Sequence, residues 1–251
     1  FGSLCEQATV RGAAREEHPN QLPMLSRLLA EDYLSCFGIW RGKGLTKCIV
    51  LDLDNTLYPP DCNLFHQVDM RMRAFIANYF DIDEDEAFKL QKRYFRDYGT
   101  TLNGLMRNHD MKPDAFLDYV HDIDVSVIAP NPVMDLALAK LPGRKVVYTN
   151  GSLAHAERIM ARLGIGHHFD GVFDIVTADF MPKPDIAAYH ALLAKHAIDP
   201  EGAVMVAITK SRSRMVGVTL AGTSNRCEYL TASLTLRPVR SASNQRLSKV
   251  G

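Results

Sequence analysis

Short apolar runs alternate with helical patterns through the middle of this chain, and that alternation constrains its fold more than any other feature. Four runs have the length and composition of buried strands, at residues 48–51, 146–148, 173–176 and 203–206. Helical patterns separate the last three, and one of them, from Ala156 to Leu163, ends at Gly164. Because helices connect parallel strands, the pattern predicts an α/β fold: a Rossmann-like parallel sheet with helices on both faces.

A long helical stretch separates the first run from the second. It holds roughly 90 residues, whereas a crossover between parallel strands needs only about a dozen. Two apolar stripes at the helical period begin at Val68 and Ala87, and a third helix begins at Pro113. We therefore expect an inserted helical cap subdomain over the edge of the sheet.

The chain is expected to divide into four parts. They are a poorly defined N-terminal extension (1–46), an α/β core (47–60 and 142–207), a helical cap insert (61–141) and an atypical tail (208–251). The tail is rich in Ser and Thr, and only residues 215–220 fit a strand. Its pattern is consistent with a changed reading frame, a disordered segment or a divergent natural end.

Charge and composition limit the expected partners. From Ile208 onward the sequence has eight Lys and Arg residues and one acidic residue, Glu228, which gives this segment a net charge of +7. Because the whole chain has a net charge of zero, residues 1–207 carry −7. An acidic body is not expected to bind nucleic acid. The sequence has no run of about 18 apolar residues, so no membrane span is predicted. It also has no basic stretch that leads into an apolar segment, so a secretory signal is not predicted. The five scattered cysteines include no C-x-x-C pair, which predicts a reducing, cytoplasmic location. The sequence does not indicate an oligomeric state.

Two carboxylates follow the first predicted strand. Asp52 ends the run, and Asp54 comes two residues later. Open α/β sheets bind ligands at the carboxyl ends of their strands, and burying the first carboxylate would be costly unless a cation or a reaction requires it. The alternative is a turn in which aspartate side chains close the strand.

Polar side chains also follow the next two predicted strands. Thr149 and Asn150 come after the second, and Lys183 follows the third within a Pro-Lys-Pro segment. Each has an ordinary structural interpretation, since Thr149 fits a helix N-cap and Lys183 fits a solvated surface residue. Their common position after strands of one sheet favours a shared site.

Residues 52–56 (Asp-Leu-Asp-Asn-Thr), 148–152 and 181–185 resemble, in order, the first three motifs of the haloacid dehalogenase-like (HAD) hydrolases. The resemblance implies that Asp52 is a nucleophile that forms an aspartyl-phosphate, and that Asp54 is its acid/base partner. Dehalogenases of this superfamily lack the second aspartate, so Asp54 favours phosphate chemistry.

The same resemblance implies how phosphate and metal are bound. The Thr149 hydroxyl and the Asn150 backbone N–H would hold phosphate oxygens near a helix N-terminus, and Lys183 would neutralise charge. A Mg²⁺ ion would be bound by Asp52, by Asp54 through its backbone carbonyl, and by a later acid.

Residues from about 49 to 205 are similar to the pyrimidine 5'-nucleotidase branch of that family. The similarity lies in residues 57–60, 98–102, 119–124 and 169–174. It implies a small-molecule substrate, a nucleoside monophosphate such as UMP or CMP, whose base the cap recognises. The alternative interpretation is that Tyr98 and Tyr119 only pack in the core of the cap and that His121 is a hydrogen-bonded residue at a helix end.

The sequence departs from the family after the fourth predicted strand. An acidic Mg²⁺ ligand is expected there, but the residues are Ala207 and Ile208. Asp174 and Asp179 are the candidates to replace it. We also expect no regular final strand, which would leave a sheet edge uncovered.

These features leave several functions open. The first is a Mg²⁺-dependent nucleotide phosphatase impaired by the missing acid. The second is a non-catalytic or damaged relative, and further alternatives are a generic small-phosphate phosphatase or a dehalogenase.

Overall fold

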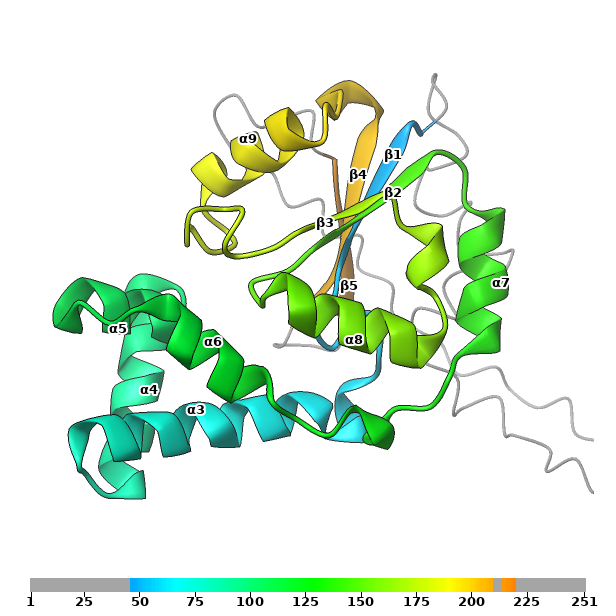
Figure 1. The fold of residues 1–251 in the computed structure, drawn as a ribbon. Helices are drawn as coiled ribbons and strands as arrows, with labels where there is room; N and C mark the ends of the chain where they lie inside the picture. Colours follow the sequence, from blue (N-terminus) through cyan, green and yellow to red (C-terminus); the bar gives the residue numbers. More distant parts are fainter. Residues whose placement is uncertain (1–45, 210–213, 220–251) are drawn as a thin grey trace, which may run out of the picture.

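A five-stranded sheet lies at the centre of the computed structural model, which describes residues 46–209 and 214–219 (Figure 1). Its strand order is β3-β2-β1-β4-β5. The strands are β1 (Cys48–Asp52), β2 (Arg144–Tyr148), β3 (Gly171–Phe173), β4 (Ala203–Thr209) and β5 (Arg214–Thr219). The first four are parallel, and β5 is antiparallel to β4. The predicted α/β fold with a Rossmann-like parallel sheet is confirmed.

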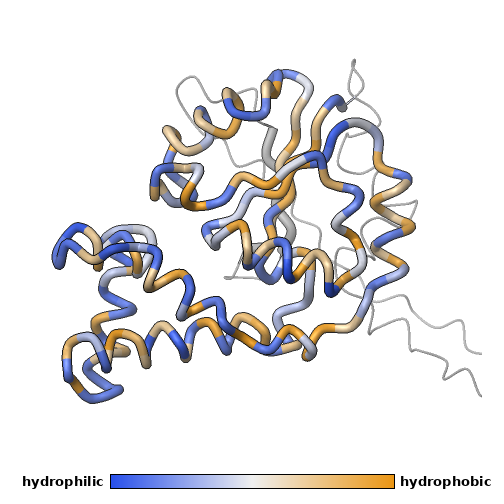
Figure 2. Tube along the Cα trace, in the orientation of Figure 1, coloured by the Kyte–Doolittle hydropathy of each residue, from blue (hydrophilic) through white to orange (hydrophobic). Residues whose placement is uncertain are grey.

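Alternate residues of the central strand face opposite layers. Ile49 and Leu51 belong to the cluster that contains side chains of α7 (Pro132–Lys140) and α8 (Leu153–Leu163). Cys48 and Val50 belong to the cluster that contains side chains of α9 (Ile186–Lys195). Both faces of the sheet are thus covered, as the two-residue period of a buried strand requires. Figure 2 shows the strands as mainly apolar, as expected for strands buried on both sides.

Helix α8 ends where the sequence predicts, at Gly164, but it begins at Leu153, with Ser152 rather than Thr149 as its N-cap. Its N-cap Ser152 accepts a hydrogen bond from the backbone N–H of His155, and its C-cap Gly164 has a φ of 76°. Gly164 donates to the carbonyls of Met160 and Ala161, and a side chain would be strained at this left-handed position. The start of α8 is important because it lies directly after β2.

Four helices form a bundle at one end of the sheet (Figure 1). They are α3 (Leu64–Phe80), α4 (Glu84–Tyr98), α5 (Thr101–His109) and α6 (Pro113–His121). The bundle has its own buried cluster, which includes Ile76, Tyr94 and Phe116. Ile175, which follows β3, belongs to the same cluster, so the bundle packs directly on the carboxyl end of the sheet.

Helix α7 packs with the sheet instead. Its residues Met134 and Leu138 are buried in the cluster that contains Leu51. The sequence placed the end of the helical insert at residue 141, after this helix. We propose that the cap consists of α3–α6 alone and that α7 belongs to the α/β core.

Two strand boundaries differ from the prediction. The third strand was predicted at residues 173–176, but it ends at Phe173. The chain turns at Asp174, whose side chain accepts hydrogen bonds from the backbone N–H groups of Leu153 and Thr177. Strand β4 continues past residue 206 to Thr209 and pairs with β5, so the expectation of an uncovered edge beside β4 was wrong. The remaining expectations for residues 1–45 and 220–251 lie outside the described residues. Within the described part of the chain, no helix is long and apolar enough to cross a membrane.

Candidate active site

The ends of the parallel strands bring together the residues that the sequence singled out. Asp52 is the last residue of β1, Thr149 follows β2, and Lys183 lies in the loop after β3. The Lys183 ammonium donates hydrogen bonds to Oδ1 of Asp52 and to the carbonyl of Tyr148, the latter at 2.8 Å. The side chains of Lys183 and Asp52 are 16% and 15% exposed, so a small molecule can reach this ion pair.

A second donor fixes the other oxygen of Asp52. The Thr56 hydroxyl donates to Oδ2 at 2.7 Å. The turn after β1 places it there: Asn55 has a φ of 59°, and the N–H groups of Thr56 and Leu57 both donate to the Leu53 carbonyl. Both carboxylate oxygens are therefore oriented before any ligand arrives, which lowers the cost of organising a reaction.

One carboxylate oxygen of Asp54 accepts hydrogen bonds from two side chains. Its Oδ1 accepts the Tyr58 hydroxyl at 2.7 Å and Nε2 of His155 at 3.0 Å. Thr149 Oγ1 lies 3.4 Å from the other oxygen, Oδ2. Burial raises the pKa of Asp54, but the charge on His155 and the hydrogen bonds from His155 and Tyr58 outweigh it and hold the pKa well below its usual range. Asp54 is therefore ionised in the free protein.

His121, at the end of cap helix α6, contacts this group from the opposite side. Its ring stacks on that of His155 with centroids 4.2 Å apart, and its Nδ1 lies 3.0 Å from the Ser152 hydroxyl. Burial, with the charges of His155 and Arg158, lowers the pKa of His121 to about 3, although Asp54 opposes the shift. His121 is thus a neutral, buried residue through which the cap meets the start of α8.

Several polar groups of the second predicted motif already form hydrogen bonds within the protein. Thr149 is buried, and its hydroxyl oxygen accepts the Gly151 N–H at 2.9 Å. The Asn150 side chain accepts the Lys183 N–H at 2.9 Å and so fixes the lysine loop against the end of β2. The N–H of Leu153, in the first turn of α8, already donates to Asp174.

The residues at the strand ends fit a Mg²⁺ ion with one carboxylate fewer than the family pattern. Leu51 pairs with Val206, which places Ala207 next to Asp52 on the neighbouring strand. Neither candidate aspartate supplies the missing ligand. Both oxygens of Asp174 accept hydrogen bonds from backbone N–H groups, and Asp179 is exposed on a turn. Mg²⁺ is commonly bound by one or two carboxylates together with substrate phosphate oxygens, so Asp52 and the Asp54 carbonyl remain a usable but weak donor set.

Sequence reasoning assigned no place in this site to Thr56, Tyr58 or His155, and it named His121 only as part of the cap segment at residues 119–124. Two of them carried a detectable signal, because Thr56 and Tyr58 each lie four residues after an aspartate, the spacing of one helical turn. His155 lies in the first turn of the helix after Thr149, so its position above the strand end could also have been inferred.

The cap segments that the sequence singled out meet the core at two points. Gly99, at the end of α4, lies so close to Pro182 that an added Cβ would be 2.9 Å from Cγ of that proline. Arg158 of α8 donates to the carbonyls of His121 and Ile123, at 2.8 and 2.7 Å. The rings of Tyr98 and Tyr119 pack within the bundle, against Tyr94 and Phe75 respectively.

A parallel sheet whose strand ends gather two aspartates, a threonine and a lysine beneath a helical insert fits a hydrolase. A family model described as haloacid dehalogenase-like hydrolase matches residues 46–207. The chain belongs to this family.

One similar protein is "Phosphate metabolism protein 8" of Saccharomyces cerevisiae, 30% identical over 160 residues. The match covers 55% of this chain and 48% of the yeast protein, so it spans about half of that relative's length.

Two similar solved structures are at low identity. The HAD-hydrolase YfnB from Bacillus subtilis bound to magnesium is 12% identical, with a TM-score of 0.39 over 64% of this chain and 77% of that one. The L-2-haloacid dehalogenase from Xanthobacter autotrophicus with chloropropionic acid covalently bound is 14% identical, with a TM-score of 0.36 over 64% and 69%.

Proposed function

We propose that this hydrolase is a Mg²⁺-dependent phosphomonoesterase that acts through an aspartyl-phosphate on Asp52. The observation that carries the proposal is the pairing of Asp52 with Lys183 beside a second carboxylate, Asp54, which has its own donors. One carboxylate is thus placed to attack and the other to transfer protons. The Mg²⁺ ion, when bound, would neutralise charge on the nucleophile and on the phosphate oxygens.

In the first half-reaction, an Asp52 oxygen forms a bond to phosphorus while the bond from phosphorus to the ester oxygen breaks. The leaving oxygen takes a proton from Asp54 and departs as an alcohol. Asp54 is ionised in the free protein, but an anionic phosphate ester beside it raises its pKa by like-charge repulsion and favours uptake of this proton. Lys183 offsets the negative charge that accumulates around phosphorus.

In the second half-reaction, water attacks the phosphorus of the aspartyl-phosphate. Asp54, now a carboxylate, accepts the proton of that water, and the bond between phosphorus and the Asp52 oxygen breaks to release inorganic phosphate. The hydrogen bonds from Tyr58 and His155 keep Asp54 in place for both transfers.

We further propose that the substrate is a small-molecule nucleotide, a nucleoside monophosphate such as UMP or CMP. Support comes from two cap segments: Gly99 approaches Pro182 in the loop that carries Lys183, and His121 stacks on His155 of α8, the helix that follows Thr149 and Asn150. Free thiols at Cys48 and Cys62 are in keeping with the proposed cytoplasmic location.

Phosphate release from a panel of substrates tests this function. UMP and CMP should be hydrolysed with a higher kcat/KM than a sugar phosphate, and only when Mg²⁺ is present. Equal kcat/KM across nucleotides and sugar phosphates would remove the nucleotide assignment and leave a general phosphatase.

A second candidate function, a non-catalytic relative that only binds phosphate, is favoured by one observation, Ala207 beside Asp52. It predicts phosphate binding by calorimetry without turnover at any Mg²⁺ concentration. Turnover that saturates with Mg²⁺ excludes it.

A further inference from the structure

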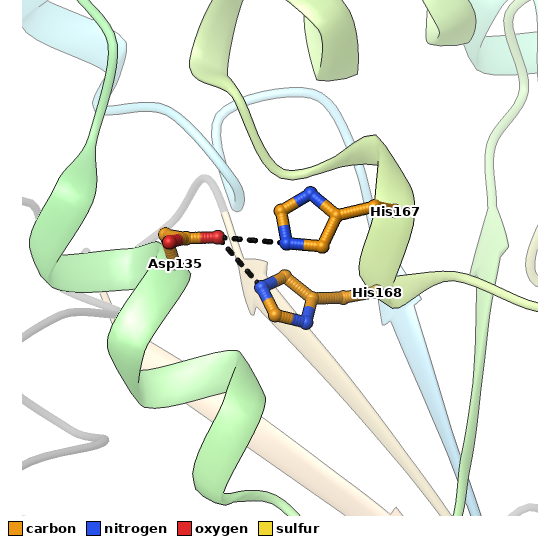
Figure 3. A group of neighbouring side chains, drawn as sticks. All are labelled: Asp135, His167 and His168. Atoms are coloured by element: carbon orange, nitrogen blue, oxygen red, sulfur yellow. Dashed lines mark hydrogen bonds and ion pairs between the residues drawn. The ribbon is translucent and has the colours of Figure 1, made fainter.

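Asp135, His167 and His168 form a group of side chains that the proposed reaction does not use (Figure 3). Nε2 of His168 lies 2.7 Å and Nε2 of His167 lies 3.1 Å from the same atom, Oδ1 of Asp135. The two rings are adjacent, with centroids 4.0 Å apart. Figure 3 shows both rings directing one nitrogen toward the carboxylate, which projects from α7.

We propose that this group binds a divalent transition-metal ion, with Zn²⁺ the best fit among common ions. The two imidazole nitrogens and the carboxylate oxygen all lie within 4.8 Å of one another. Tetrahedral zinc with bonds of about 2.0–2.1 Å needs its ligand atoms about 3.3 Å apart. The distances of 2.7 and 3.1 Å between the histidine nitrogens and the Asp135 oxygen are slightly shorter than this, so small side-chain movements would admit the ion. Mixed nitrogen and oxygen ligands suit zinc, cobalt or nickel, whereas Mg²⁺ prefers oxygen alone.

The backbone already holds the three ligands together. The N–H of Asn131, which caps α7, donates to the carbonyl of Leu163 at the end of α8, at 3.0 Å. The N–H of His168 donates to the Ile165 carbonyl at 3.1 Å within the turn η3 (Gly166–His168). Little of the chain must be ordered when the metal binds, which favours affinity.

The exposure of the group leaves room for water in the coordination sphere. The side chain of His168 is 12% exposed, that of Asp135 37% and that of His167 65%. Helix α7 lies on the side of the sheet away from the α4–α6 bundle (Figure 1), so the ion would join α7 to η3 rather than take part at Asp52. Metal binding here is therefore independent of the proposed phosphatase reaction.

Titration of the full chain, freed of metal with a chelator, tests the proposal. Zn²⁺ should bind by calorimetry, and Co²⁺ should give the visible absorption of nitrogen and oxygen ligation without the strong charge-transfer band of cysteine ligation. The melting temperature should rise with Zn²⁺ concentration, because an ion that binds only the folded state stabilises it.

Variants assign the binding to this group. His167→Gln, whose side chain is the most exposed of the three, should weaken Zn²⁺ binding about tenfold or more, as should Asp135→Asn. His66→Gln, an exposed histidine on α3, is the matched control and should bind as the parent does. The absence of Zn²⁺ binding to the parent, or equal affinity in His167→Gln and the parent, would overturn the proposal and leave two histidines hydrogen-bonded to an aspartate.

Discussion

Oδ1 of Asp54 receives its two hydrogen bonds from side chains of different origin. Tyr58 lies on the same turn, whereas His155 comes from the helix after β2. Burial and the neighbouring carboxylate raise the pKa of Tyr58, so its hydroxyl remains protonated and keeps donating. Asp54 therefore has one fixed orientation, with Oδ2 on the side of Thr149.

His155 is expected to position Asp54 rather than to react. At a Mg²⁺ concentration high enough to saturate the weak site, His155→Ala should lower kcat about tenfold, a part of the 10²–10⁴-fold that general acid/base catalysis contributes, with little change in KM. His155→Gln, whose amide can still donate a hydrogen bond, should recover most of the loss. A lower kcat in both variants to the same extent would show that a hydrogen bond to Asp54 is not what matters.

Asp52→Asn should abolish phosphatase activity, because an amide oxygen does not form the acyl phosphate. The measurement is phosphate release together with mass spectrometry of the quenched parent, which should carry a phosphoryl group on Asp52. Asp61→Asn, an exposed aspartate on the 3₁₀ turn after β1, serves as the control. Turnover by Asp52→Asn at the parent's rate would refute the mechanism.

His121 should make the fold sensitive to acid. Its pKa is lowered to about 3 from 6.5, so between these values the unfolded chain binds a proton that the folded chain does not. Stability from this residue is therefore complete above pH 6.5 and is lost as the pH falls, by at most about 1.4 kcal/mol per pH unit. The ionisable groups that face it are His155, Asp54 and Arg158.

The free energy of unfolding in urea, measured from pH 7 to pH 4.5, tests this sensitivity. His121→Gln should show a shallower loss with falling pH than the parent, whatever its stability at pH 7. The exposed control His66→Gln should keep the parent's slope. Parallel curves for His121→Gln and the parent would contradict the expectation.

At the scale of elements, β4 determines how complete the metal site is. Residue 207 pairs in register beside Asp52, and Ala207 packs on the same face of the sheet as Val50, two residues before Asp52. A carboxylate at position 207 would therefore project to the face that carries Asp52.

Ala207→Asp should lower the Kd for Mg²⁺ by about tenfold, or about 1.4 kcal/mol. It should also raise phosphatase activity at millimolar Mg²⁺, where we expect the unmodified chain to remain near background. Ala207→Asn, of nearly the same size without the charge, is the control. Equal Mg²⁺ dependence in the two variants would show that position 207 does not reach the ion.

Sequence patterns located the elements better than their ends. The periodicity of residues 156–163 and the C-cap Gly164 define α8 because both are local properties. The early end of β3 depends on Asp174 bonding to Leu153, a residue of the preceding helix, and no pattern within residues 173–176 could reveal it. The pairing of β4 with β5 likewise depends on contacts that the sequence pattern does not contain.

At the scale of the molecule, the candidate site was predictable to the extent that it follows from topology. Asp52, Thr149 and Lys183 meet because parallel strands end at one edge of the sheet, and that rule needs only the order of strands. His121 was out of reach, because its place against His155 depends on how the helical bundle is seated on the core. Residues that join two subdomains depend on packing angles, which sequence periodicity does not specify.

The position of β1 in the sheet has a consequence for how the chain folds. This strand comes first among the strands of the described residues, yet its neighbours are β2 and β4, with Cys48 paired to Arg144 on one side and to Ala203 on the other. Contacts of such long sequence separation form slowly, whereas the α3–α6 helices contact near neighbours in the chain. The helical bundle should therefore acquire protection from hydrogen exchange before the strand that carries Asp52. During synthesis, β1 can pair with β4 only after residues 203–206 have emerged from the ribosome.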